Sequence, residues 1–363
     1  MDFVSPLPEQ LEPISRLQSL LVSISKDNIH CVLYWIKNSV FFSDETKIQD
    51  LAREILSIPS IRPFSIESIS DLCARLCIHS ENFKEILLHE ILNEKKECSS
   101  CHHTLRRLFK KGVYDHAQIL EIVSKQQYLC FVIYFAQYIS DISMIKRGIF
   151  KQFYDCSVSY ELLNQDNWKI LNDYQEYGWD SNSIVFKIKY DEYVELQRLS
   201  SCPGFDLNQK VTKSSFETLR IVGKPSLIEY AAAFGSLRSF KFLLLSGAIL
   251  NESINFCAVG GGNLDIVHIC YEKGLLKSNN ISSSISYRQS NILKWLSENG
   301  FAEDICPSYC LEANNISAAY MYLKNEDDHQ LSLALDTSIR CGYECFASYL
   351  LSIGTDSNIM SRF

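Results

Sequence analysis

The stretch PSLIEYAAAFGSLRSFKFLLLSGA, residues 225–248, decides the fold. Apolar residues recur there at helical spacing, first on a short segment rich in Ala and then on a second segment. Gly235 stands between the two segments, and Gly247 follows the second, where a left-handed helix end favours glycine. The second segment ends in three consecutive leucines, 243–245, of which at least two should be buried. The stretch therefore predicts two short antiparallel helices joined by a tight turn.

This helix pair recurs along the rest of the chain. The glycines that close successive units are Gly247, Gly274, Gly300 and Gly354. Their separations are 27, 26 and 54 residues, the last being two units of 27. Turns between the paired helices are expected at or near Gly235, Gly262, Asn291, Asn315 and Gly342. Because one helix pair cannot bury its apolar face alone, about five to six such units must stack into a solenoid.

The residues before these units show helical periodicity without a repeat. Asp44 is placed to cap a helix that continues through Leu51 and Ile55 and stops at Pro59. Residues 119–139 are mostly apolar and predict one buried helix or a broken pair. We therefore predict an all-α protein with two domains, an α-helical leader over 1–178 and the solenoid over 179–363.

The second domain resembles an ankyrin-repeat solenoid. The segments that carry the resemblance are DEYVELQRLSSCPGFDLNQ (191–209), the stretch 225–248 and CAVGGGNLDIVHICYEKG (257–274). Together they are similar to the divergent ankyrin proteins expanded in some parasitic protists, and residues 32–55 resemble the helical leader of that group. The resemblance implies a protein-interaction solenoid without catalytic chemistry. The chain lacks the Thr-Pro-Leu-His of the standard repeat, and its period is below the usual value of about 33 residues, so the β-hairpin fingers should be reduced to loops.

Composition limits the possible classes of protein. With 35 Lys and Arg against 43 Asp and Glu, the net charge of −8 does not favour general nucleic-acid binding. The 14 cysteines are too sparse for a disulfide scaffold. The opening residues lack a secretory signal, and no apolar run is long enough to cross a bilayer. We therefore expect a cytoplasmic protein whose thiols are reduced.

Two segments could carry chemistry. Cys98-Ser99-Ser100-Cys101-His102-His103 has the spacing of half a zinc site, but it lacks a second ligand pair. The alternative is a polar loop before a helix, and we expect no metal, no cofactor and no catalytic residue. The basic run 106–111 could meet nucleic acid or acidic lipid, but the solvated face of an amphipathic helix explains it better.

The remaining candidate site is a surface. In an ankyrin stack the first helices line a concave groove, and by register the exposed positions are Tyr230, Phe234, Tyr287 and Arg340. Aromatic and Arg side chains at such positions suit protein binding, although Tyr230 and Phe234 could equally fill space between units. The partner and the oligomeric state do not follow from the sequence. The main alternative is a substrate adaptor whose leader docks a larger complex such as a ubiquitin ligase, and an enzyme with its site around residues 98–103 is a further one.

Overall fold

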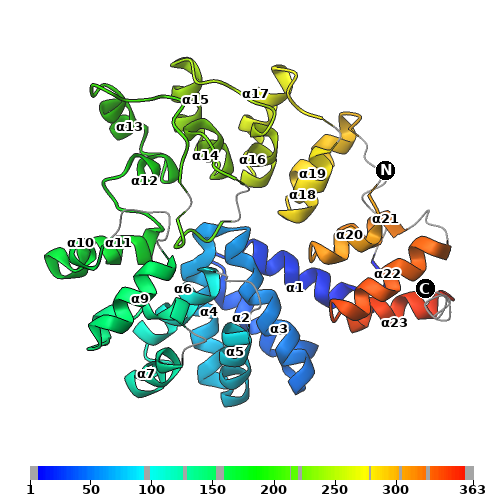
Figure 1. Cartoon of the computed structure of the whole chain (residues 1–363). Helices are drawn as coiled ribbons and strands as arrows, with labels where there is room; N and C mark the ends of the chain where they lie inside the picture. The colour runs from blue at the N-terminus through cyan, green and yellow to red at the C-terminus, as the bar shows by residue number, and fades with distance from the viewer. Residues whose placement is uncertain are drawn as a thin grey trace. The chain divides into compact units, whose positions relative to one another are not determined.

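The fold is entirely helical in the part of the chain that the structure describes. The computed structural model describes residues 7–93, 99–125, 129–152, 159–212, 214–219, 223–277, 279–301, 305–323 and 328–355 (Figure 1). These residues form helices α1–α23 and short 3-10 turns, with no β-strand among them. Within these ranges, Lys210 and Ser226 form one isolated antiparallel β-bridge. The prediction of an all-α protein is therefore confirmed.

The chain forms two compact units. Unit 1 consists of Met1–Val22 together with Ile228–Phe363, and unit 2 is Ser23–Leu227. The predicted boundary between residues 178 and 179 lies inside unit 2. That residues 1–178 and 179–363 are separate domains stays a prediction.

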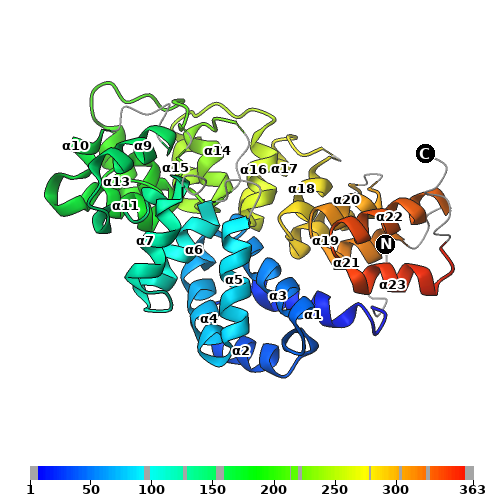
Figure 2. The same cartoon turned by 60° about the horizontal axis from the view of Figure 1, so that its bottom comes forward.

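Unit 2 is built from helices α2–α13, with α3, α4, α5 and α6 packed against one another (Figure 2). As expected, Asp44 caps α3, because its Oδ1 accepts the Lys47 N–H at 3.0 Å. The apolar stretch 119–139 is broken into α7, α8 and a 3-10 turn at Ala136–Tyr138. The helices are α2 (Ile29–Lys37), α3 (Glu45–Ser57), α4 (Ile66–His79), α5 (Glu81–Asn93), α6 (Ser99–Lys110), α7 (His116–Ser124), α8 (Leu129–Val132), α9 (Ile142–Gln152), α10 (Tyr160–Leu163), α11 (Lys169–Tyr177), α12 (Ile184–Lys189) and α13 (Tyr193–Ser200).

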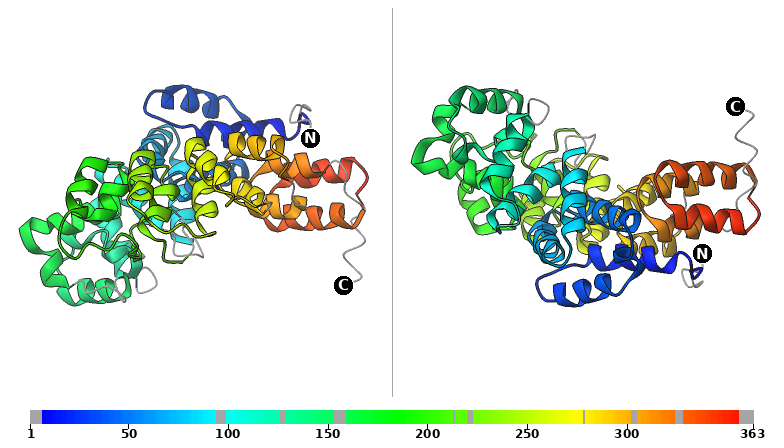
Figure 3. Two further views of the ribbon diagram at one scale, coloured as in Figure 1. Left: turned by 90° about the horizontal axis from the view of Figure 1, so that it is seen from above. Right: turned by 90° about the horizontal axis from the view of Figure 1, so that it is seen from below.

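Among its described residues, unit 1 contains five successive helix pairs and helix α1. The pairs are α14 (Leu227–Ala233) with α15 (Leu237–Leu245), α16 (Ile254–Gly261) with α17 (Leu264–Glu272), α18 (Asn280–Ser286) with α19 (Ser290–Glu298), α20 (Pro307–Glu312) with α21 (Ile316–Leu323), and α22 (Asp328–Arg340) with α23 (Glu344–Ser352). First helices of neighbouring pairs contact each other, as α16 with α18 and α20 with α22. Helix α1 (Glu12–Val22) packs on α21, and Figure 3 shows both from two sides.

Each pair turns at a residue in the left-handed region. These residues are Gly235, Gly262, Arg288, Asn314 and Gly342, at separations of 27, 26, 26 and 28. Turns are thus confirmed at Gly235, Gly262, Asn315 and Gly342. Asn291 is wrong as a turn residue, because it lies inside α19 and the chain reverses at Arg288, three residues earlier. The closing residues Gly247, Gly274, Gly300 and Gly354 all have positive φ, as expected.

In the second, third and fourth pairs, the residue after the left-handed turn residue ties its pair to the preceding pair. Asn263 Nδ2 donates to the Gly235 carbonyl at 3.0 Å, and Gln289 Nε2 donates to the Gly260 carbonyl at 2.8 Å. Asn315 Nδ2 repeats the contact on the Ile285 carbonyl at 3.0 Å. These three donors form a series that we name the amide ladder. At Gly260 the ladder supplies a donor to a carbonyl in the last turn of α16, and at Ile285 it adds a second donor to a carbonyl that also accepts the Arg288 N–H at 3.0 Å.

Candidate partner-binding surface and buried polar sites

Tyr230 and Phe234 do not lie on the surface. Their exposed fractions are 2% and 7%, and their ring centroids lie 4.6 Å apart. The expectation that they are exposed is therefore wrong. The physical reason is the packing of α14, whose residues are all buried: Leu227, Ile228, Glu229 and the three alanines 231–233 are buried with them. These two rings fill space, which was the alternative interpretation of the pattern.

Of the other two residues predicted to be exposed, Arg340 is exposed and Tyr287 is not fully so. Tyr287 is half-buried, and its ring lies against Gly260, where an added Cβ would be 3.1 Å from the ring. Arg340 is exposed at the end of α22, and its guanidinium meets Glu312 Oε1 of the preceding pair at 2.8 Å. Tyr287 therefore joins two pairs, while Arg340 remains accessible to a partner.

The first helices bring further residues to the same region. Ser286, Glu312 and Arg340 each stand two residues before the left-handed turn residue of their pair. Tyr309 joins this row, because its hydroxyl shares a hydrogen bond with Ser286 Oγ at 2.7 Å. Phe256 on α16 is 47% exposed, although Asn255 before it and Ala258 after it on the same helix are buried. We name the residues Phe256, Ser286, Tyr309, Glu312 and Arg340 the first-helix row. Sequence reasoning missed Phe256, although the buried positions on either side of it signal a side chain that points away from the core.

The second helices carry aromatic residues that sequence reasoning also missed. The Tyr271 ring lies 5.4 Å from Trp295 and 6.0 Å from Phe301, and the His268 ring lies 4.9 Å from Trp295. Tyr271 is 44% exposed. This cluster links α17 to α19 on helices that do not carry the first-helix row, so it offers a matched control surface.

The segment 98–103 is helical and buried where the structure describes it. Cys98 lies outside the described residues, and α6 begins at Ser99. The alternative of a polar loop is therefore wrong for residues 99–103, because Cys101, His102 and His103 are all buried. Both imidazoles pack against Tyr134, with ring centroids 5.1 and 5.2 Å away. Within the described ranges, no group of three or more His, Cys, Asp or Glu residues is arranged to hold a metal ion.

His103 is held as a neutral donor. Its Nε2 donates to the Phe216 carbonyl at 2.7 Å. Burial lowers the pKa of His103 to about 3, and the nearby charges of Arg107, Arg106 and Lys189 act in the same direction. The imidazole is therefore a structural hydrogen-bond donor at neutral pH rather than a proton carrier.

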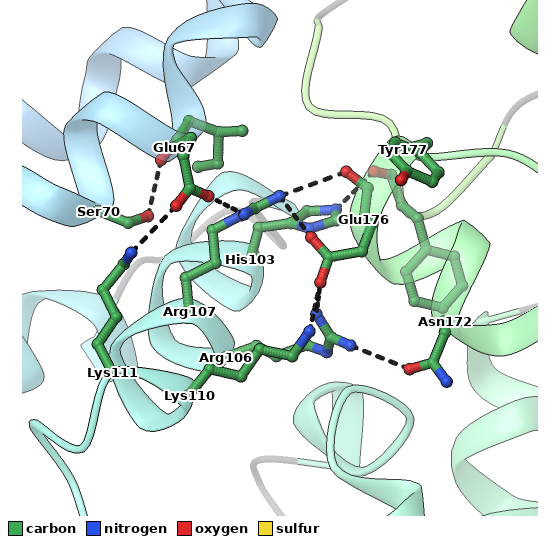
Figure 4. A network of polar contacts seen from close by, with 12 residues as sticks. Glu67, Ser70, His103, Arg106, Arg107, Lys110, Lys111, Asn172, Glu176 and Tyr177 are labelled. Atoms are coloured by element: carbon green, nitrogen blue, oxygen red, sulfur yellow. Dashed lines mark hydrogen bonds and ion pairs between the residues drawn. The ribbon is translucent and has the colours of Figure 1, made fainter. Parts of the chain in front are cut away.

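The basic run on α6 is engaged by acidic residues of the same unit (Figure 4). Arg106 meets Glu176 of α11 at 2.7 Å, and Arg107 meets the same carboxylate at 2.8 Å. Lys110 also contacts Glu176, and Lys111 reaches Glu67 of α4 at 3.0 Å. Burial opposes the charge on Glu176, but Arg107, Lys110 and Arg106 outweigh it and lower its pKa to about 2. The alternative of a freely solvated helix face is thus replaced by an ion-pair network.

A second buried pair closes the same region. Lys189 of α12 meets Glu217 Oε2 at 2.9 Å, and both side chains are less than a tenth exposed. Lys189 Nζ also donates to the Tyr177 carbonyl at 2.8 Å, so the ammonium is held by more than one acceptor. The Glu217 carbonyl in turn accepts the Ser99 hydroxyl at 2.6 Å. Residues 214–219 are therefore fixed to α6 and α12 by buried polar contacts.

Comparison with known proteins gives no relative from which to transfer a function. No protein-family model matches the chain, and no curated protein matches it. In the described part of the chain, no helix is long and apolar enough to span a membrane. Functional assignment therefore depends on the surface of the helix pairs.

Proposed function

We propose that this chain is a non-enzymatic protein-interaction module whose helix pairs form a degenerate ankyrin-like solenoid and bind a protein partner through the first-helix row. The observation that carries the proposal is the regular repetition of the turns, at 26–28 residues, with the amide ladder joining successive pairs. Such stacking presents equivalent positions of successive pairs, here Ser286, Glu312 and Arg340, and Phe256 and Tyr309 stand on the same set of first helices. Repeat proteins use rows of this kind as extended binding surfaces.

The chemistry of the row supports recognition of a protein. Phe256 offers an accessible aromatic ring, and Tyr309 and Arg340 add the other residue types that concentrate binding energy at interfaces. The sequence of unit 1 contains 10 Lys and Arg against 17 Asp and Glu, hence a net charge of −7. A partner with a basic surface would be attracted to it by long-range electrostatics.

Affinity capture with matched variants tests the proposal. Phe256→Ser combined with Arg340→Glu should abolish capture of a partner without changing the melting temperature, because both side chains are accessible. The control combines Tyr271→Ser with Lys294→Glu on the second helices, and it should capture the partner as the wild type does. Loss of the partner in the control alone would place binding on the second helices and overturn the assignment of the first-helix row.

A further inference from the structure

Helix α1 occupies unit 1 as a ligand occupies a binding site. The other helices of this unit lie in one continuous segment, Ile228–Phe363, apart from the start of α14. Helix α1 is connected to that segment only through the whole of Ser23–Leu227. Within unit 1 it is therefore held by noncovalent contacts alone.

The contacts of α1 are concentrated at the turn between α20 and α21. Gln18 Nε2 donates to Asn314 Oδ1 at 2.8 Å, and Gln18 Oε1 accepts the Ile316 N–H at 3.1 Å. The Ile316 N–H stands at the start of α21, where a backbone donor has no acceptor within its own helix. The side chain of Gln18, from a distant segment of the chain, therefore caps this helix. Ser15 Oγ and Ser317 Oγ share a third hydrogen bond of 2.7 Å.

This site distinguishes glutamine from similar side chains. The Tyr343 hydroxyl also donates to Asn314 Oδ1, which fixes that oxygen as an acceptor facing Gln18. The site thus presents one acceptor and one donor to a single side-chain amide. Glutamate in place of Gln18 has no proton to give to Asn314 Oδ1, so a carboxylate oxygen would face that acceptor. The lost hydrogen bond and the repulsion between the two oxygens weaken binding.

Helix α1 is amphipathic, as a helix that docks on a protein surface should be. Leu11, Ile14, Leu17 and Leu21 are buried along one side, whereas Glu12 is exposed. Such a pattern is how an amphipathic helix binds in a groove. A helix of 11 residues is marginal in isolation, so α1 gains its order from the site that it occupies.

We propose that the turn between α20 and α21 is a recognition site for amphipathic helices that carry Ser and Gln three residues apart beside an apolar stripe, and that α1 is its resident, displaceable ligand. A helix of this pattern supplied by another molecule binds after α1 is released. Because α1 competes for the same site, it sets the affinity that such a helix must exceed. This inference does not depend on the proposed function, because the capture experiment changes Phe256 and Arg340 and leaves in place Asn314, Ile316 and Ser317, which hold Gln18 and Ser15.

Peptide exchange on the full chain tests the proposal. The probe is a fluorescent peptide of residues 7–25, and its binding is compared between the wild-type chain and the Gln18→Glu chain by anisotropy. Because the weakened resident helix competes less, the Gln18→Glu chain should bind the wild-type peptide roughly tenfold more tightly than the wild-type chain does. A Gln18→Glu peptide should bind that chain roughly tenfold less tightly, whereas a Glu12→Gln peptide should bind it unchanged.

Two results would overturn the proposal. One is a folded Gln18→Glu chain that binds no peptide, and the other is equal binding of the wild-type and Gln18→Glu peptides. If the Gln18→Glu chain fails to fold, hydrogen exchange of the wild-type chain decides. The amides of α1 should exchange through local opening, faster than those of α16–α19. Equal protection would show that α1 is an integral part of unit 1 and overturn its role as a displaceable ligand.

Discussion

Leu243, Leu244 and Leu245 are adjacent leucines in three different environments. Leu243 is fully buried, Leu244 is half-buried, and Leu245 is 87% exposed at the end of α15. Leu243→Ala should lower the free energy of unfolding of unit 1 by about 2–5 kcal/mol, from lost burial and the cavity left behind. Leu245→Ala should change it by no more than about 0.5 kcal/mol. Urea unfolding followed by far-ultraviolet circular dichroism measures both, and equal losses would contradict this arrangement of the helix.

His103 makes the stability of unit 2 depend on pH. Its folded pKa of about 3 lies below the ordinary value of 6.5, so the unfolded chain binds the proton more readily. The stabilisation is complete above pH 6.5 and is lost as the pH falls toward 3. Between pH 7 and 4.5 the loss from this residue should be roughly 2–3 kcal/mol.

A matched variant isolates the contribution of His103. His103→Gln keeps a donor for the Phe216 carbonyl but cannot titrate, so most of the decrease between pH 6.5 and 4.5 should disappear. Glu176 supplies a separate reference, because its lowered pKa of about 2 places its own loss below pH 4.5. Urea midpoints followed by tryptophan fluorescence provide the measurement. An unchanged slope above pH 4.5 in His103→Gln would show that another group is responsible.

The chemistry around α6 shows which residue-level features a sequence reveals. The basic run 106–111 is visible in the sequence, but its main partner, Glu176, is 70 residues from Arg106. No local pattern encodes that pairing, because it depends on how α11 packs. The burial of Tyr230 is different, since the sequence left the surface and the space-filling interpretations equally open, and the packing of α14 decides between them.

Among the helix pairs, Asn315 and Asn291 provide a comparison at the level of the element. Asn315 Oδ1 accepts the Ala318 N–H at 3.1 Å, and its Nδ2 belongs to the amide ladder. Asn315→Ala should therefore cost about 1–3 kcal/mol, because it removes a helix cap and the hydrogen bond that ties this pair to the Ile285 carbonyl of the preceding pair. Asn291 is exposed inside α19, and Asn291→Ala should change stability by no more than about 0.5 kcal/mol. Thermal melts of both variants give the comparison, and similar losses would argue against the ladder.

The period of the pairs was predictable, and individual turns were less so. Glycine marks the left-handed position in three of the five turns, and there the sequence located the turn correctly. Arg288 and Asn314 occupy that position in the other two turns. Asn adopts the left-handed region readily and Arg does so seldom, so the turn at Arg288 carried the weakest signal. The sequence pattern therefore places this turn at Asn291, three residues after the position at which the chain reverses.

At the scale of the whole molecule, the order of segments in the sequence does not match the compact units. Helix α1 has the same apolar spacing as the helices that follow it, and nothing in that spacing assigns it to unit 1. The assignment depends on Gln18 and Ser15, whose partners lie about 300 residues away. Sequence patterns predict which face of a helix is buried, but they do not identify the surface that buries it.

The division predicted from the sequence and the division into compact units imply different folded fragments, residues 1–178 in the first case and 23–227 in the second. A fragment of residues 1–178 lacks the partners of several polar groups buried in unit 2. It loses the Phe216 carbonyl that accepts from His103, the Glu217 carbonyl that accepts from Ser99, and the hydroxyl of Ser214 that donates to Gly178 at 2.6 Å. A buried polar group without its partner costs about 1–3 kcal/mol, and three such losses are comparable with the whole stability of a domain.

A fragment of residues 23–227 keeps all of these contacts, together with the buried pair of Lys189 and Glu217. We therefore expect fragment 23–227 to unfold cooperatively and to show a near-ultraviolet circular dichroism signal from its packed aromatic rings. Fragment 1–178 should keep helical far-ultraviolet signal but lose the near-ultraviolet signal, since its core stays open along α6. Full-length protein serves as the reference for both spectra. Cooperative unfolding of fragment 1–178, with a midpoint equal to that of fragment 23–227, would show that residues 179–227 add nothing to the folding of unit 2.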